Sequence, residues 1–211
     1  MLGKQAQKNY RLGVQFPPEA YFHMKTGKFI LVTGFFGAGK SSLVNAAIKN
    51  IPNLVYLKTI TTRPKRKEEL EEYSFVTLEK YEILRRESKK WDHSEIAGNY
   101  YGANISEYNK IILEGKNVIC CIAPEVKTIE QMSSIYAVKP LLIWIDAKLS
   151  IANKRLVNSE INERIARKNN DLQTEKNASI IKAKVDWIFT PKGNIEEDKT
   201  AFAILIKKLL K

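Results

Sequence analysis

The stretch that decides the fold reads FILVTGFFGAGKSS and runs from Phe29 to Ser42. It opens with a continuous apolar run, Phe29–Val32, which is typical of a strand buried on both faces of a parallel sheet. The next residues match the pattern G-x-x-x-x-G-K-S between Gly34 and Ser41. A helical segment then continues to about Asn50. A buried strand, a glycine-rich turn and a helix in this order predict a phosphate-binding loop.

The residue types of this loop explain its chemistry. Glycines let the backbone curl so that successive N–H groups converge on a phosphate, and the helix N-terminus adds a positive dipole end. Lys40 is expected to reach the β- and γ-phosphates, and Ser41 is expected to ligate Mg²⁺. We therefore predict ATP and Mg²⁺ as cofactors. The predicted ATP-binding residues are Gly34, Phe35, Phe36, Gly37, Ala38, Gly39, Lys40, Ser41 and Ser42.

Further apolar runs alternate with helical segments along the rest of the chain. Asn104 and Asn194 are each followed three residues later by a glutamate, which predicts a helix N-cap at each. Lys58–Glu72 reads as a charged loop. Strands alternating with helices predict an α/β fold, a P-loop NTPase-type parallel sheet with helices on both faces. The predicted strands after the first are Leu54–Lys58, Val118–Ile122, Leu141–Ile145 and Trp187–Phe189, with a helix at Leu78–Glu87.

Composition restricts the class of protein. A chain of 211 residues that is 44% hydrophobic and 27% charged suits one globular domain. No uncharged stretch approaches the ~18 residues of a membrane helix, and no secretory segment is visible, so we predict a cytoplasmic protein. The adjacent Cys120 and Cys121 point to opposite faces of a strand and cannot form an ordinary disulfide. The net charge of +12 favours anionic partners, but it is spread without a basic block, so no specific nucleic-acid partner is expected.

Three segments downstream of the loop resemble the guanylate kinase family. They read TITTRPKR from Thr59, YSFV from Tyr73 and GNYYG from Gly98, in this order. The resemblance runs from about Phe29 to the C-terminus, so residues 1–28 are predicted to be an N-terminal extension and 29–211 a guanylate kinase-like domain. It implies an acceptor-binding region at 59–103, which is a small nucleotide-monophosphate-binding insert, and a shortened helical lid at 155–168.

The resemblance also implies a role for each matching residue. Asp92 stands six residues before Gly98, where the family carries a glutamate that reads the guanine edge. Arg155 and Arg164 fall where the family has lid arginines that neutralise the transferring phosphoryl group. The implied activity is ATP-dependent phosphorylation of a nucleoside monophosphate, GMP to GDP. The implied GMP-binding residues are Thr59, Arg63, Arg66, Tyr73, Asp92 and Tyr101, and the implied catalytic residues are Lys40, Arg63, Arg155 and Arg164.

The sequence departs from the family pattern beside the acceptor. Cys121 and Ala123 occupy two positions where the family has acidic residues, and Ala103 stands where a serine or threonine usually follows GNYYG. Glu125 and Asp146 are candidates to replace the missing acids. Donor chemistry is therefore predicted to be intact and acceptor recognition altered. Two other readings stay open: a kinase of another phosphorylated acceptor such as ribose 1,5-bisphosphate, and a catalytically inactive binding module.

Overall fold

The computed structural model describes residues 26–65, 73–96, 98–136, 138–148, 150, 152 and 174–211. The predicted extension as far as residue 25 and the predicted lid at 155–168 lie outside these residues. Gly27 and Lys28, the last residues of the predicted extension, are bonded to the domain. The N–H of Gly27 donates to the carbonyl of Ile112 at 2.8 Å, and the N–H of Lys28 donates to Oδ1 of Asn117 at 2.8 Å.

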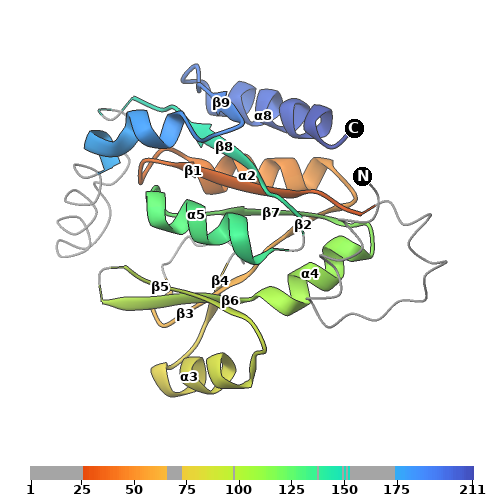
Figure 1. The fold of residues 1–211 in the computed structure, drawn as a ribbon. Coiled ribbons are helices and arrows are strands. Elements are labelled where there is room, and N and C mark those ends of the chain that lie inside the picture. The colour runs from red at the N-terminus through yellow and green to blue at the C-terminus, as the bar shows by residue number, and fades with distance from the viewer. Residues whose placement is uncertain are drawn as a thin grey trace.

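The larger of two sheets is parallel throughout, as the sequence predicts, with strand order β2-β7-β1-β8-β9 (Figure 1). Its central strand is β1, and all six residues of β1 are buried. This burial agrees with the unbroken apolar run in the sequence. The predicted strand 54–58 ends two residues early, and the predicted strand 118–122 lies one residue further back. The strands are β1 (Phe29–Gly34), β2 (Leu54–Tyr56), β7 (Asn117–Cys121), β8 (Leu141–Ile145) and β9 (Trp187–Phe189).

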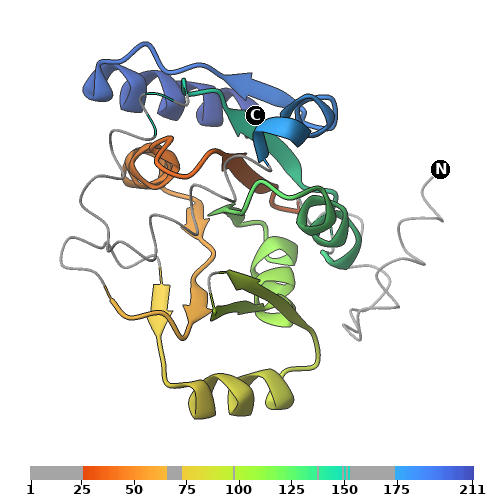
Figure 2. The same ribbon diagram turned by 90° about the vertical axis from the view of Figure 1, so that its left-hand side faces the viewer.

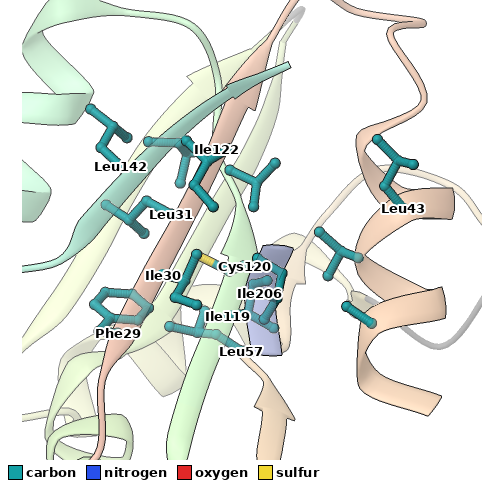
Figure 3. Close-up of a cluster of buried hydrophobic side chains, with 14 of the residues drawn as sticks. Phe29, Ile30, Leu31, Leu43, Leu57, Ile119, Cys120, Ile122, Leu142 and Ile206 are labelled. Atoms are coloured by element: carbon teal, nitrogen blue, oxygen red, sulfur yellow. The ribbon is translucent and has the colours of Figure 1, made fainter. Parts of the chain in front are cut away.

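Helices cover both faces of this sheet (Figure 2). On one face lie α2 (Lys40–Asn50) and α8 (Ile195–Leu209), and on the other lie α4 (Ile105–Leu113), α5 (Val126–Ile135) and the helical residues 174–182. Figure 3 shows the core between these layers, where side chains of β1, β7 and β8 meet α2 and α8. The buried apolar surface of this core is the main stabilising contribution to the domain.

A second, smaller sheet has the strand order β4-β3-β6-β5, with α3 (Leu78–Glu87) on its outer side (Figures 1 and 2). β3 pairs in parallel with β4 and antiparallel with β6, which is also antiparallel to β5. The prediction of a loop over Lys58–Glu72 is therefore wrong for its first residues, because Thr59–Thr61 pairs on both sides. The strands are β3 (Thr59–Thr61), β4 (Tyr73–Phe75), β5 (Trp91–Ile96) and β6 (Asn99–Asn104).

Leu57 and Lys58 carry the chain from the larger sheet to the smaller one. The N–H of Leu57 donates to the carbonyl of Ile119 at 2.9 Å. The hydroxyl of Tyr108, on α4, accepts from the N–H of Lys58 at 2.7 Å and donates to the carbonyl of the same residue at 3.2 Å. Burial raises the pKa of Tyr108 to about 12, so this hydroxyl keeps its proton at neutral pH. Helix α4 thereby fixes the backbone where the two sheets join.

The two predicted helix caps have different outcomes. Oδ1 of Asn194 accepts from the N–H groups of Glu196 and Glu197 at 3.1 and 3.4 Å, so the cap of α8 is confirmed. The side chain of Asn104 makes no cap bond to α4, and its Oδ1 is buried without a hydrogen-bond partner in the described part of the chain. Asn104 still belongs to β6, paired with Trp91, and the strand pleat directs its side chain toward the face that α3 covers.

None of the helices in the described ranges is long and apolar enough to span a bilayer. Cys120 and Cys121 are both free thiols. They pair with Leu31 and Val32 of β1 respectively, so they point to opposite faces of the sheet, as the sequence predicts.

Candidate active site

The phosphate-binding loop connects β1 to α2. Gly34, Gly37 and Gly39 all have positive φ, which side chains rarely tolerate. Packing also requires glycine at position 34, because a Cβ there would lie 2.6 Å from the carbonyl oxygen of Ile145. Gly39 is the N-cap of α2 and contributes no side-chain bond to the first turn. A helix N-terminus arranged in this way leaves its N–H groups directed at an incoming phosphate.

Lys40 is folded back over this loop. Its Nζ donates to the carbonyls of Gly34 at 2.7 Å and Phe35 at 2.9 Å, and it lies 5.4 Å from the ring centre of Phe36. Phe35 is buried and meets the indole ring of Trp144 edge-on at 5.5 Å. The ammonium group of Lys40, which the sequence predicts to bind phosphates, is therefore held against the loop backbone. Ser41 and Ser42 follow it in the first turn of α2.

One face of the small sheet forms the second part of the candidate site. Residues directly opposite each other on neighbouring strands place their side chains on the same side. Thr59 pairs with Tyr73, and Asp92 pairs with Ala103. Tyr101 lies two residues from Ala103 on β6 and therefore shares its face. We call this face the acceptor face. The register places on it Thr59, Thr61, Tyr73, Phe75, Asp92, Ser94, Tyr101 and Ala103.

Arg63 lies at the edge of the acceptor face and is only 7% exposed. Its guanidinium carbon is 5.4 Å from the ring centres of both Tyr73 and Phe75, and Nη1 donates to the carbonyl of Pro64 at 2.8 Å. The ring of Tyr73 in turn lies 6.2 Å from that of Tyr101, nearly perpendicular to it. The structure thus brings three of the predicted phosphate-binding residues together, with aromatic rings holding the cation.

Asp92 is a partly buried carboxyl group on the acceptor face. Burial raises its pKa above the usual range, while the backbone N–H and the charge of His93 act in the opposite direction. The charge of Asp92 also contributes to the raised pKa values of the buried Cys120 and Tyr136, so it lies toward β7 and the end of α5. A carboxylate removed from water in this way gains most from a ligand that brings N–H donors.

Asp146 and Glu125, the candidates to replace the family's acidic residues at positions 121 and 123, both have other polar partners. Asp146 receives Nζ of Lys182 at 2.7 Å and the indole N–H of Trp144 at 3.2 Å. Glu125 precedes α5 and accepts from the hydroxyl of Thr128 at 3.2 Å. Within the described ranges, no three His, Cys, Asp or Glu side chains gather as a metal site. Ser41, the predicted cation ligand, lies in the first turn of α2 directly after Lys40.

Three of the predicted residues, Arg66, Arg155 and Arg164, lie outside the described residues. The sequence reasoning missed Phe75 and Ser94, which the register adds to the acceptor face. Their signal was present as period-2 spacing, since Phe75 lies two residues after Tyr73 and Ser94 two residues after Asp92.

Comparisons with known proteins converge on one family. The family model for guanylate kinase matches residues 26–190. The chain is 31% identical to the guanylate kinase of Malacoplasma penetrans, over 74% of this chain and 85% of that protein. It is 36% identical to the guanylate kinase of Rubrobacter xylanophilus, where the match spans 46% of this chain and about half (51%) of the relative. In fold it is similar to the crystal structure of guanylate kinase from Anaplasma phagocytophilum, with a TM-score of 0.63, 19% identity and coverage of 88% and 87% of the two chains.

Proposed function

The chain belongs to the guanylate kinase family, and from this premise we propose that it transfers the γ-phosphoryl group of ATP to GMP. A phosphate oxygen of GMP attacks the γ-phosphorus, the bond to the β-phosphate oxygen breaks, and ADP and GDP leave. The observation that carries the proposal is the acceptor face, where the register places Thr59, Tyr73, Asp92 and Tyr101 on the same side of the small sheet. No covalent intermediate is needed, because positioning and charge neutralisation supply the catalysis.

On the donor side, Lys40 exchanges its bonds to the carbonyls of Gly34 and Phe35 for the β- and γ-phosphate oxygens. The backbone N–H groups at the start of α2 donate hydrogen bonds to the phosphate oxygens. Ser41 fits Mg²⁺, which takes few protein ligands and binds mainly to water and substrate phosphates. An ion held at Ser41 would supply positive charge that neutralises the phosphate oxygens during transfer. Arg155 and Arg164 complete this neutralisation in our proposal.

On the acceptor side, Arg63 binds the GMP phosphate together with the hydroxyls of Tyr73 and Tyr101, and Arg66 adds a second guanidinium group. Charge-assisted bonds of this kind are roughly twice as strong as neutral ones. Guanine offers its N1–H and its exocyclic amine to Asp92, while Thr59 contacts the base. Since Asp92 is one methylene shorter than the family's glutamate and Cys121 replaces an acid, we propose a raised KM for GMP and weaker discrimination than in the family.

A screen of acceptors tests this function. The chain is supplied with ATP, Mg²⁺ and, separately, GMP, AMP, CMP, UMP or ribose 1,5-bisphosphate, and ADP formation is measured. We expect GMP to give the highest kcat/KM. Lys40→Ala should lower turnover by ~10²–10³-fold, while Lys49→Ala, at the exposed last turn of α2, should not. A preference for the sugar bisphosphate, or no transfer to any acceptor, would overturn the proposal.

The cytoplasm is the location we propose for this activity. It contains the nucleotide substrates of the proposed reaction.

A further inference from the structure

The face of the small sheet opposite the acceptor face packs on α3, and Tyr81 is the one residue of α3 (Leu78–Glu87) that is buried. This tyrosine is completely buried. Its ring meets the indole of Trp91 edge-on at 5.5 Å and stacks on the ring of Tyr100 at 5.8 Å. The imidazole of His93 lies 5.9 Å away. These rings come from α3, β5 and β6, so Tyr81 is the point at which the three elements meet.

The hydroxyl of Tyr81 has three polar neighbours. They are Nε1 of Trp91 at 3.2 Å, the carbonyl oxygen of Tyr101 at 2.9 Å and Nδ1 of His93 at 2.8 Å. Indole N–H can only donate and a carbonyl can only accept, while a phenol has one proton and two lone pairs. The proton of Tyr81 therefore goes to Tyr101, and its two lone pairs accept from Trp91 and His93. This arrangement uses the full capacity of the hydroxyl and places a proton on Nδ1 of His93.

These three bonds reach β5 and β6, the strands that carry Asp92 and Tyr101, from the face of the sheet opposite the acceptor face. Trp91 and His93 immediately flank Asp92, so one hydroxyl holds both neighbours of the carboxyl group that reads the base. The third bond holds the carbonyl of Tyr101, whose side chain lies on the acceptor face near Tyr73. The pairing of β5 with β6 sets the spacing between Asp92 and Tyr101, and the hydroxyl of Tyr81 adds bonds to both strands from the opposite face.

We propose that Tyr81 is a positioning residue for the acceptor site, whose hydroxyl braces β5 and β6 behind Asp92 and Tyr101 and so maintains the spacing that the strand pairing gives these two residues. This inference rests on the proposed function. Gly102 belongs to the same device, because a Cβ at this position would lie 2.6 Å from the hydroxyl of Tyr81 and 2.3 Å from Nε1 of Trp91. The second glycine of the GNYYG segment is therefore required by the close approach of α3 and β5.

Tyr81→Phe tests the proposal, because it removes the hydroxyl and keeps the ring. Losing a buried hydrogen bond of this kind changes an equilibrium by about fivefold or more. We expect the KM for GMP to rise about fivefold to tenfold, with kcat and the KM for ATP within about twofold of the wild type. Tyr136→Phe is the matched control, since the hydroxyl of Tyr136 is also buried but has no hydrogen-bond partner among the described residues. A folded Tyr81→Phe variant with an unchanged KM for GMP, or with equal changes for both substrates, would overturn the proposal.

Two measurements on the unliganded protein separate this inference from the proposed function. The ¹⁵N chemical shift of Nδ1 in His93 should be that of a protonated nitrogen in the wild type. Amide hydrogen exchange should become at least about fivefold faster over β5 and β6 in Tyr81→Phe, with no change in β1 and α2. If GMP is not a substrate but both results hold, the proposed function fails and the anchoring by Tyr81 stands. If exchange in β5 and β6 is unchanged, the inference fails whatever the acceptor is.

Discussion

The ammonium group of Lys182 lies 2.7 Å from Oδ1 of Asp146, just beyond the end of β8. The same oxygen accepts the indole N–H of Trp144. A carboxylate that already holds a cation and an N–H donor is poorly placed to support Mg²⁺ as well.

We therefore expect Asp146→Asn to leave the Mg²⁺ concentration for half-maximal activity nearly unchanged. Removing a group that supports a metal typically costs ~10–100-fold in affinity, which a Mg²⁺ titration of the phosphoryl-transfer rate would detect easily. Ser41→Ala is the comparison, because its hydroxyl is the proposed ligand and its loss should raise the Mg²⁺ requirement. A tenfold rise in Asp146→Asn would instead restore Asp146 as a metal-supporting acid.

Asp92→Asn should erode the preference for GMP over AMP. A carboxylate accepts from both N1–H and the exocyclic amine of guanine, whereas an asparagine amide presents only one oxygen acceptor. The ratio of kcat/KM for the two nucleotides should fall, while turnover with AMP changes little. Glu95→Gln is the matched control, since Glu95 lies on the same strand but is exposed and points away from the acceptor face. An unchanged ratio in Asp92→Asn would remove Asp92 from base recognition.

The same substitution should stabilise the unliganded protein at neutral pH. Burial raises the pKa of Asp92, so its favourable contribution to folding is present below the usual value of 3.8 and is lost as the pH rises through the raised value. Asparagine carries no charge to desolvate. Thermal unfolding should therefore show a higher Tm for Asp92→Asn than for the wild type at pH 7, with the difference shrinking as the pH falls toward 3.8. A difference that does not depend on pH would contradict this cause.

Gly102→Ala should destabilise the small sheet and weaken GMP binding together. The added methyl group would lie 2.3 Å from Nε1 of Trp91, and overpacking of this kind costs about 1–3 kcal/mol. Urea unfolding and the KM for GMP measure the two effects. Gly98→Ala is the control, because nothing lies within 4 Å of a Cβ there and its only penalty is the positive φ of 72°. It should lose stability and leave the KM for GMP unchanged.

Removal of residues 1–24 should leave the chemistry intact. The described contacts of the domain begin with Gly27 and Lys28, which bond to Ile112 and Asn117, and the truncation leaves both in place. We expect kcat with the best acceptor to stay within about tenfold of the full chain, a change of ~1.4 kcal/mol in barrier. A larger loss in a folded truncated protein would assign the segment a part in the reaction.

The larger sheet was predictable because its strands are unbroken apolar runs, and Leu141–Ile145 and Trp187–Phe189 were predicted with their observed bounds. The small sheet was not predicted strand by strand. β3 and β4 have three residues each. β5 reads WDHSEI and has polar residues on both faces, because one face bonds to Tyr81 of α3 and the other belongs to the acceptor face. Short strands with two occupied faces lack the alternation that marks a half-buried strand.

The candidate site was predictable where the residue spacing carries the chemistry, as in the phosphate-binding loop. The part that depends on register was not. Tyr81 lies inside the predicted helix Leu78–Glu87, and nothing in the neighbouring sequence indicates that its hydroxyl contacts Trp91, His93 and Tyr101. Asn104 shows the opposite error, because a local cap signal was overridden by the strand to which the residue belongs.

The two adjacent thiols of β7, Cys120 and Cys121, differ in exposure, and this difference can be used to measure how often the core of the domain unfolds locally. Cys121 is partly accessible, whereas Cys120 is 1% exposed and burial raises the pKa of its thiol. A thiol reagent can therefore react with Cys121 in the folded protein, but it can reach the sulfur of Cys120 only when the centre of the sheet separates from its helices. The rate at which the second label is incorporated then follows the population of opened molecules. Mass spectrometry of the labelled protein would read the stability of the core at one residue, with no engineered probe.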